Sequence, residues 1–192
     1  MAYQHSVFAI DLKAFRDVWG RENPALGDDI RDDQAEAIAS NYDQFEEDIV
    51  QHGAPVVARA MYEIFAGRPE KSRHGFQYGY ALKLIAAQLG EQVGGGELAW
   101  FDELLDPLLA RARCPSVEHM MGRGVLPLEI PRPTDFPEIG TVELGGCAIG
   151  IEAMAMIRPL TTDVETLRVI DEVRGWFEAA AKTKRGLIWF VY

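Results

Sequence analysis

The segment from Arg73 to Ile85 holds more chemically active side chains than any other part of this chain. A histidine and two tyrosines stand close together at His74, Tyr78 and Tyr80. A histidine titrates near neutral pH, and beside hydroxyl groups it can take part in acid–base catalysis. One hypothesis is therefore a small enzyme or ligand-binding domain with its site around these three residues.

Glu118 and His119 form a second acid–base pair, on a predicted short helix. The enzyme hypothesis adds Glu118 or His119 to the site, and it predicts that His74, Glu118 and a tyrosine hydroxyl converge in one concave pocket. The turn that follows Glu118-His119 offers Met and Gly instead of another ligand, so a surface pair is the competing interpretation.

Known catalytic and metal-binding motifs are missing from the sequence. Gly94-Gly95-Gly96-Glu97 lacks the lysine and the serine or threonine of a phosphate loop, and there is no Gly-x-Ser-x-Gly. The four histidines are too far apart in sequence to indicate a zinc site. We expect no metal and no cofactor, and the sequence favours a protein that is not an enzyme.

The helix expected over Phe76–Leu89 also has a purely structural interpretation. At 100° per residue, Phe76 and Tyr80 fall on one side of this helix and Tyr78 on the other. A helix that is apolar on two opposed sides is buried between layers. Gly79 then marks the place where another helix or the sheet comes close.

The two ends of the chain predict a small sheet. Tyr3–Ile10 is strand-like, and Leu187–Tyr192 is a run of six apolar residues that must be paired and covered. We expect these strands to pair with each other. The predicted fold is α+β and mostly helical, a single globular domain over residues 1–192, with six to eight helices around the sheet and Phe76–Leu89 as the central buried helix.

Hydrophobic spacing and helix-capping residues locate the other helices. The segments expected to be helical are Leu12–Trp19, one or two helices in the acidic stretch, Val56–Ala66, Leu98–Arg111 with a kink or break near Asp106, Leu144–Ile157, and Thr162–Lys182 with Thr162 and Glu165 as a capping box. Gly94–Gly96 is expected to be a loop. The proline-rich segment from Cys114 to Gly140 is expected to be irregular and pinned along the surface.

Most of the net charge of −11 is concentrated in one stretch. Residues 27–48 contain nine acids and one base, Arg31, which is a charge of −8. Such a surface repels nucleic acid and attracts basic proteins. A solvated helix face that only keeps the protein soluble is the competing interpretation. The residues expected to bind a partner are Asp28, Asp29, Asp32, Asp33, Glu36, Glu46, Glu47 and Asp48.

The location expected from the sequence is the cytoplasm. No run approaches the roughly 20 apolar residues that span a bilayer, and Met1–Val7 does not resemble a signal peptide. Cys114 and Cys147 lie in apolar surroundings, as reduced, buried cysteines do.

Three sequence blocks resemble a family of bacterial domains of unknown function. They are His74–Leu82 followed by Leu89-Gly90-Glu91, Pro131–Gly140, and Glu172–Trp176 before the terminal aromatic strand. The resemblance covers most of the chain and implies a compact, stand-alone cytoplasmic domain. It carries no known activity, so it transfers no catalytic residues.

The leading functional hypothesis is a non-enzymatic binding protein, most concretely an acidic immunity or inhibitor protein that neutralises a basic protein partner. It depends on the acidic stretch and on the missing catalytic motifs. A third hypothesis is a scaffold subunit, which requires an exposed apolar patch at Met120-Met121 or in the proline-rich segment.

Overall fold

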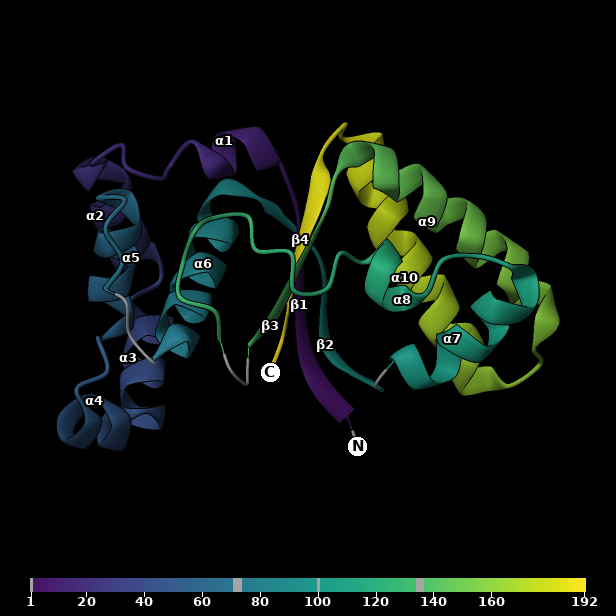
Figure 1. Ribbon diagram of the computed structural model, residues 1–192, viewed down its shortest axis with the longest axis horizontal. Helices are drawn as coiled ribbons and strands as arrows, with labels where there is room; N and C mark the ends of the chain where they lie inside the picture. The colour runs from purple at the N-terminus through teal and green to yellow at the C-terminus, as the bar shows by residue number, and fades with distance from the viewer. Residues whose placement is uncertain (1, 71–73, 100, 134–136) are drawn as a thin grey trace. The chain divides into compact units, whose positions relative to one another are not determined.

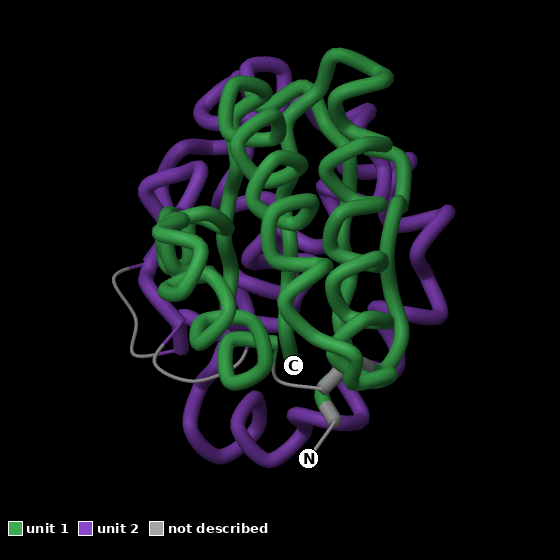
Figure 2. The backbone as a smooth tube through the Cα atoms, turned by 90° about the vertical axis from the view of Figure 1, so that its right-hand side faces the viewer, with its two compact units in different colours: residues 1–12, 90–125, 139–192 green, residues 13–89, 126–138 purple. Residues whose placement is uncertain are grey.

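The computed structural model describes residues 2–70, 74–99, 101–133 and 137–192. Figure 1 shows its helices and strands. The chain forms two compact units, which Figure 2 shows in different colours. Unit 1 comprises residues 1–12, 90–125 and 139–192, and unit 2 comprises residues 13–89 and 126–138. The part of the chain that the structure describes contains ten α-helices and one four-stranded sheet, so the fold is α+β and mostly helical, as predicted.

The sheet has the strand order β2-β1-β4-β3. Its strands are β1 (Ala2–Ile10), β2 (Glu91–Ala99), β3 (Glu138–Val142) and β4 (Gly186–Val191). The predicted pairing of the chain ends is confirmed, because β1 and β4 are antiparallel neighbours at the centre of the sheet. β4 is buried at every position, which explains why its sequence shows no alternation of polar and apolar residues.

The expected glycine loop at Gly94–Gly96 is wrong, since these residues belong to β2. They pair with β1 from Val7 to His5, next to a register shift between Val7 and Phe8. Glycine disfavours strands, but a Cβ at Gly94 would lie 2.1 Å from the indole nitrogen of Trp176. The strand uses glycine because the Trp176 ring occupies the place of a side chain.

Helices α9 and α10 pack against each other and against β4 in unit 1. The helices of this unit are α7 (Phe101–Ala112), α8 (Val117–Met120), α9 (Leu144–Ile157), a 3-10 turn (Arg158–Leu160) and α10 (Val164–Lys182). Gly150 makes the close contact between α9 and α10, where a Cβ would lie 2.4 Å from the Phe177 ring.

Two expectations for these helices are corrected. Pro107 does not break α7, which continues to Ala112. This helix starts only at Phe101, and not at Leu98, because β2 extends to Ala99. Asp163, and not Thr162, caps α10, since its carboxylate accepts a 2.8 Å hydrogen bond from the backbone N–H of Thr166.

The acidic stretch of unit 2 forms three short helices instead of one or two. The helices of this unit, with α1 at its boundary, are α1 (Leu12–Arg16), α2 (Pro24–Asp33), α3 (Ala35–Gln44), α4 (Glu46–His52), α5 (Val57–Phe65) and α6 (Gly75–Leu89). Gln34 and Phe45 leave helical geometry at the two junctions. The Phe45 ring packs against Phe76 at a centroid distance of 4.9 Å.

Helix α6 is the buried helix that the sequence predicted, with nine of its 15 residues buried. Its close neighbour at Gly79 is neither a helix nor the sheet. A Cβ at Gly79 would lie 2.7 Å from Cγ of Pro137, and one at Gly75 would lie 2.3 Å from the carbonyl oxygen of Arg132. The two glycines let the proline-rich segment lie directly on α6.

The proline-rich segment is fixed by its apolar side chains, as expected, because Pro127, Leu128 and Ile130 are buried. The scaffold hypothesis needed an exposed apolar patch at Met120-Met121 or in the proline-rich segment. Both methionines are buried, so the first of these two places offers no such patch.

Candidate functional site

Tyr78 is the centre of a hydrogen-bonded cluster between α5 and α6. Its side chain is 0% exposed. The hydroxyl donates a short hydrogen bond to the carboxylate of Glu63 and accepts one of 2.9 Å from the backbone N–H of Glu70. Arg59 donates to the other oxygen of Glu63 at 2.7 Å. The tyrosine hydroxyl therefore has both a donor and an acceptor partner inside unit 2.

The electrostatics of this cluster keep Glu63 charged and Tyr78 protonated. Burial raises the pKa of Tyr78 well above its usual range, and the neighbouring Glu63 carboxylate raises it further. Burial alone would raise the pKa of Glu63, but the hydrogen bonds from Tyr78 and Arg59 outweigh it and lower that pKa. This pattern is typical of a structural ion-pair network that links two helices.

His74 contacts the end of α4, and Tyr80 contacts the junction between α3 and α4. The Nε2 atom of His74 lies 3.1 Å from the carbonyl oxygen of His52, the last residue of α4, so this nitrogen donates. The Tyr80 ring packs against Phe45 at a centroid distance of 5.3 Å. Residues two apart on a helix point about 200° apart, so Tyr78 and Tyr80 face different elements. Arg73 lies outside the described residues.

Glu118 and His119 lie on α8 in unit 1, and both side chains are exposed. Ser116 caps this four-residue helix by accepting a hydrogen bond from the backbone N–H of His119. His74, Tyr78 and Tyr80 belong to unit 2. The two sets of residues in the enzyme hypothesis, Glu118 with His119 and His74 with the two tyrosines, therefore belong to different compact units.

The acidic surface is defined here as the eight carboxylates predicted to bind a partner, all on α2, α3 and α4. Seven of these side chains are exposed and Asp48 is half-buried. Arg31 pairs with Asp28 at 3.2 Å and approaches Asp32 at 3.7 Å. Four members of the acidic surface make no hydrogen bond or ion pair through their side chains with any residue that the structure describes. They are Asp29, Glu36, Glu46 and Glu47.

Two exposed apolar side chains lie among these carboxylates. Tyr42 on α3 is 39% exposed and Val50 on α4 is 67% exposed. Protein interfaces combine apolar or aromatic contacts with charged residues around them. The α3–α4 region thus offers contact area as well as charge.

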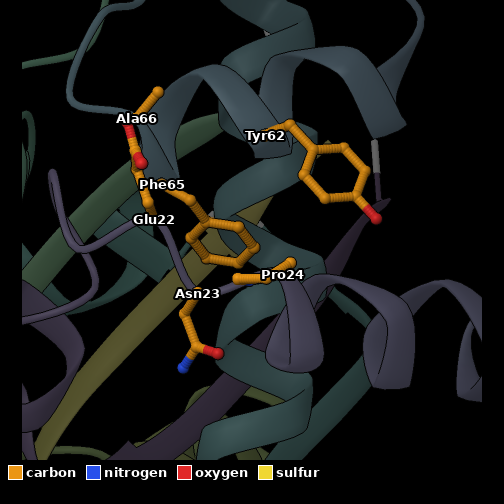
Figure 3. Close-up of a pocket in the computed structure, with 6 residues that line it drawn as sticks. All are labelled: Glu22, Asn23, Pro24, Tyr62, Phe65 and Ala66. Atoms are coloured by element: carbon orange, nitrogen blue, oxygen red, sulfur yellow. The ribbon is translucent and has the colours of Figure 1, made fainter.

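A cavity of about 290 Å³ lies beside the acidic surface, between the start of α2 and the end of α5. Figure 3 shows its six lining residues, which are Glu22, Asn23, Pro24, Tyr62, Phe65 and Ala66. The turn before α2 is held against α5 by a 3.0 Å hydrogen bond from the N–H of Glu22 to the carbonyl of Phe65. Gly27 leaves room for the Tyr62 ring, since a Cβ there would lie 2.6 Å from it.

Sequence reasoning missed this cavity. In the sequence, Asn23-Pro24 is a common helix-breaking pair, and Phe65 fits the apolar side of a helix. The left-handed φ of +36° at Glu22, which is unusual for a residue with a side chain, leaves no trace in the sequence.

The described residues contain no group of three or more His, Cys, Asp or Glu side chains that could hold a metal ion. Cys147 is buried and Cys114 half-buried, each as a free thiol. Burial raises the pKa of Cys147 to about 11, so its reactive thiolate is disfavoured. No helix in the described ranges has the length and apolar character needed to cross a membrane.

Fold and site together define a mostly helical α+β protein that carries a carboxylate-rich helical surface and a small adjoining cavity. A family model matches residues 1–192, and the chain belongs to this family, the domain of unknown function DUF7691. No curated protein and no solved structure matches the chain.

Proposed function

We propose that this protein is a non-enzymatic binding protein of the immunity or inhibitor type, which covers a basic protein partner with its acidic surface. The observation that carries the proposal is the run of carboxylates on α2, α3 and α4 whose charge is left largely unneutralised. Arg31 is the one base among nine acids in residues 27–48. Carboxylates without cationic neighbours attract a partner over a distance and speed its association.

The build of this surface also supports binding. Tyr42 and Val50 supply exposed apolar area between the charges. α4 is held at its end by His74 and at its start by the packing of Phe45 on α6. A surface that is held in place before binding loses less entropy when the partner docks.

The position of the tyrosine cluster fits the same proposal. Tyr78 is fully buried and its hydroxyl has two partners, while His74 and Tyr80 support the acidic helices. Two of the residues that first suggested a catalytic site, His74 and Tyr80, thus contact the elements that carry the acidic surface.

The test is capture of a basic partner from the lysate of the source cells at low and at high salt. We expect capture to fall steeply with salt, because exposed charges are screened beyond about 8–10 Å at 0.1–0.15 M. Neutralising carboxylates that have no structural partner should slow association about tenfold or more. The four substitutions are Asp29→Asn, Glu36→Gln, Glu46→Gln and Glu47→Gln.

A matched control removes the same number of charges from exposed positions that are not part of the acidic surface. It carries Glu103→Gln, Glu129→Gln, Glu152→Gln and Glu165→Gln. Equal capture by the two variants, or capture that ignores salt, would refute the proposal.

A further inference from the structure

The cavity beside the acidic surface has aromatic and acidic walls and no basic one. Tyr62 and Phe65 stand edge to face on α5, with ring centroids 6.3 Å apart. Glu22 is the acidic lining residue, and its side chain is exposed. The Tyr62 hydroxyl donates a 3.0 Å hydrogen bond to Asp28, which does not line the cavity and pairs with Arg31 at 3.2 Å. None of the six lining residues is a lysine, arginine or histidine.

An anion is a poor ligand for this cavity, although the cavity lies at the N-terminus of α2. The free N–H groups of a helix start would attract an anion. Here Pro24 has no N–H, and the N–H of Leu26 donates to the side chain of Asn23. The N–H of Gly27 donates to the Asn23 carbonyl at 3.2 Å. The donors are largely used, and Glu22 adds a negative charge.

A cation with an apolar stem matches the same walls. Aromatic rings attract cations through their electron-rich faces, and a nearby carboxylate adds to that attraction. Pro24 and Ala66 also line the cavity (Figure 3), and their side chains would give a hydrocarbon stem apolar contact. A volume of about 290 Å³ is near the lower limit of small-molecule sites, and so it suits one long side chain.

We propose that this cavity receives a basic side chain of the protein partner, arginine in preference to lysine, against Tyr62, Phe65 and Glu22. The inference rests on the proposed function, because it assumes that the partner is a basic protein. The planar guanidinium stacks on aromatic rings better than an ammonium group does. The cavity would then anchor one residue while the acidic surface steers the rest of the partner.

The experiment is a titration of the ¹⁵N-labelled full chain with N-acetyl-arginine amide, followed by amide shifts in the NMR spectrum. N-acetyl-citrulline amide serves as the probe control, because citrulline has nearly the same shape without the charge. We expect saturable shifts around residues 22–27 and 62–66 with the arginine probe, with millimolar affinity, and none with citrulline.

The variant Glu22→Gln removes the carboxylate charge from the cavity. Glutamine has nearly the same shape as glutamate, so the cost of the left-handed φ at this position stays the same. We expect it to weaken binding of the arginine probe about two- to fivefold, the size of an exposed cation–π or ion-pair contribution. The control Glu36→Gln removes a charge that does not line the cavity and should leave the affinity unchanged. Tyr62→Leu, which keeps a side chain beside Gly27, should weaken binding as well.

The outcomes separate this inference from the proposed function. Equal shifts with citrulline, or an unchanged affinity in both Glu22→Gln and Tyr62→Leu, would overturn the cavity assignment whether or not a partner is captured. Binding of the arginine probe at the cavity, together with capture that ignores the acidic surface, would uphold the cavity and refute the function.

Discussion

Replacing Tyr78 by phenylalanine will lower the free energy of unfolding by about 1–3 kcal/mol, the usual cost of a buried polar group that loses its partner. The substitution keeps the ring but removes the hydroxyl that donates to Glu63 and accepts from the Glu70 N–H. The Glu63 side chain is only 18% exposed, so water replaces the lost hydrogen bond poorly. Urea denaturation followed by circular dichroism measures the change.

Tyr62→Phe is the matched control for that experiment. It also removes one tyrosine hydroxyl, but from a hydrogen bond to the exposed carboxylate of Asp28. Water can hydrate both groups there, so the expected change is below about 0.5 kcal/mol. Similar losses in the two variants would contradict the role given to Tyr78.

The effect of Tyr78→Phe will depend on pH in a defined direction. The pKa of Glu63 is lower in the folded protein than in the unfolded chain, where it is about 4.3. The carboxylate therefore stabilises the fold fully above about pH 5, and this stabilisation is lost as the pH falls through the lowered pKa. Removing the Tyr78 hydroxyl raises that pKa, so the difference between wild type and variant should shrink at pH 3–4. A difference that stays constant from pH 7 to pH 3 would show that Glu63 is not the partner that matters.

Gly79→Ala will lower the free energy of unfolding by about 1–3 kcal/mol, although alanine normally stabilises a helix relative to glycine. The new Cβ would lie 2.7 Å from Cγ and 3.0 Å from Cδ of Pro137. A proline ring is rigid and cannot rotate away, so the proline-rich segment or α6 must shift. Thermal and urea denaturation measure the loss.

Gly175→Ala is the control, because Gly175 also lies within a long helix, α10. A Cβ at this position meets nothing within 4 Å. The same substitution should therefore raise the free energy of unfolding by up to about 1 kcal/mol, through the ordinary helix preference of alanine. A stabilised Gly79→Ala variant would mean that the contact with Pro137 does not limit the packing of α6.

The sequence predicted the features that depend on hydrophobic patterning. The pairing of β1 with β4 followed from the apolar run Leu187–Tyr192, which had to be covered. The burial of α6 followed from apolar residues on two sides of the helix. The limits of α9 were predicted as observed, because Leu144–Ile157 is a long apolar segment.

The errors came from glycine, proline and long-range contacts. Gly94 is in a strand because Trp176, 82 residues later, fills the space of its side chain. Gly79 meets a proline segment about 50–60 residues away, which helical projection cannot show. The cavity depends on the contact between the turn at Glu22 and α5, and local sequence patterns do not predict such long-range contacts. Tertiary context decides these places and overrides local preference.

The central position of β1 and β4 in the sheet also constrains how the protein is made. β1 is synthesised before β4, one of its two neighbours in the sheet, which begins only at Gly186. On a ribosome, the edge of β1 that pairs with β4 therefore stays unpaired until nearly all of these 192 residues have been synthesised. Helices α2 to α6 form from a continuous stretch of chain, and we expect them to fold well before the sheet closes. During that interval an unpaired edge of β1 is exposed to other chains, and slow synthesis of the chain between β1 and β4 would favour aggregation.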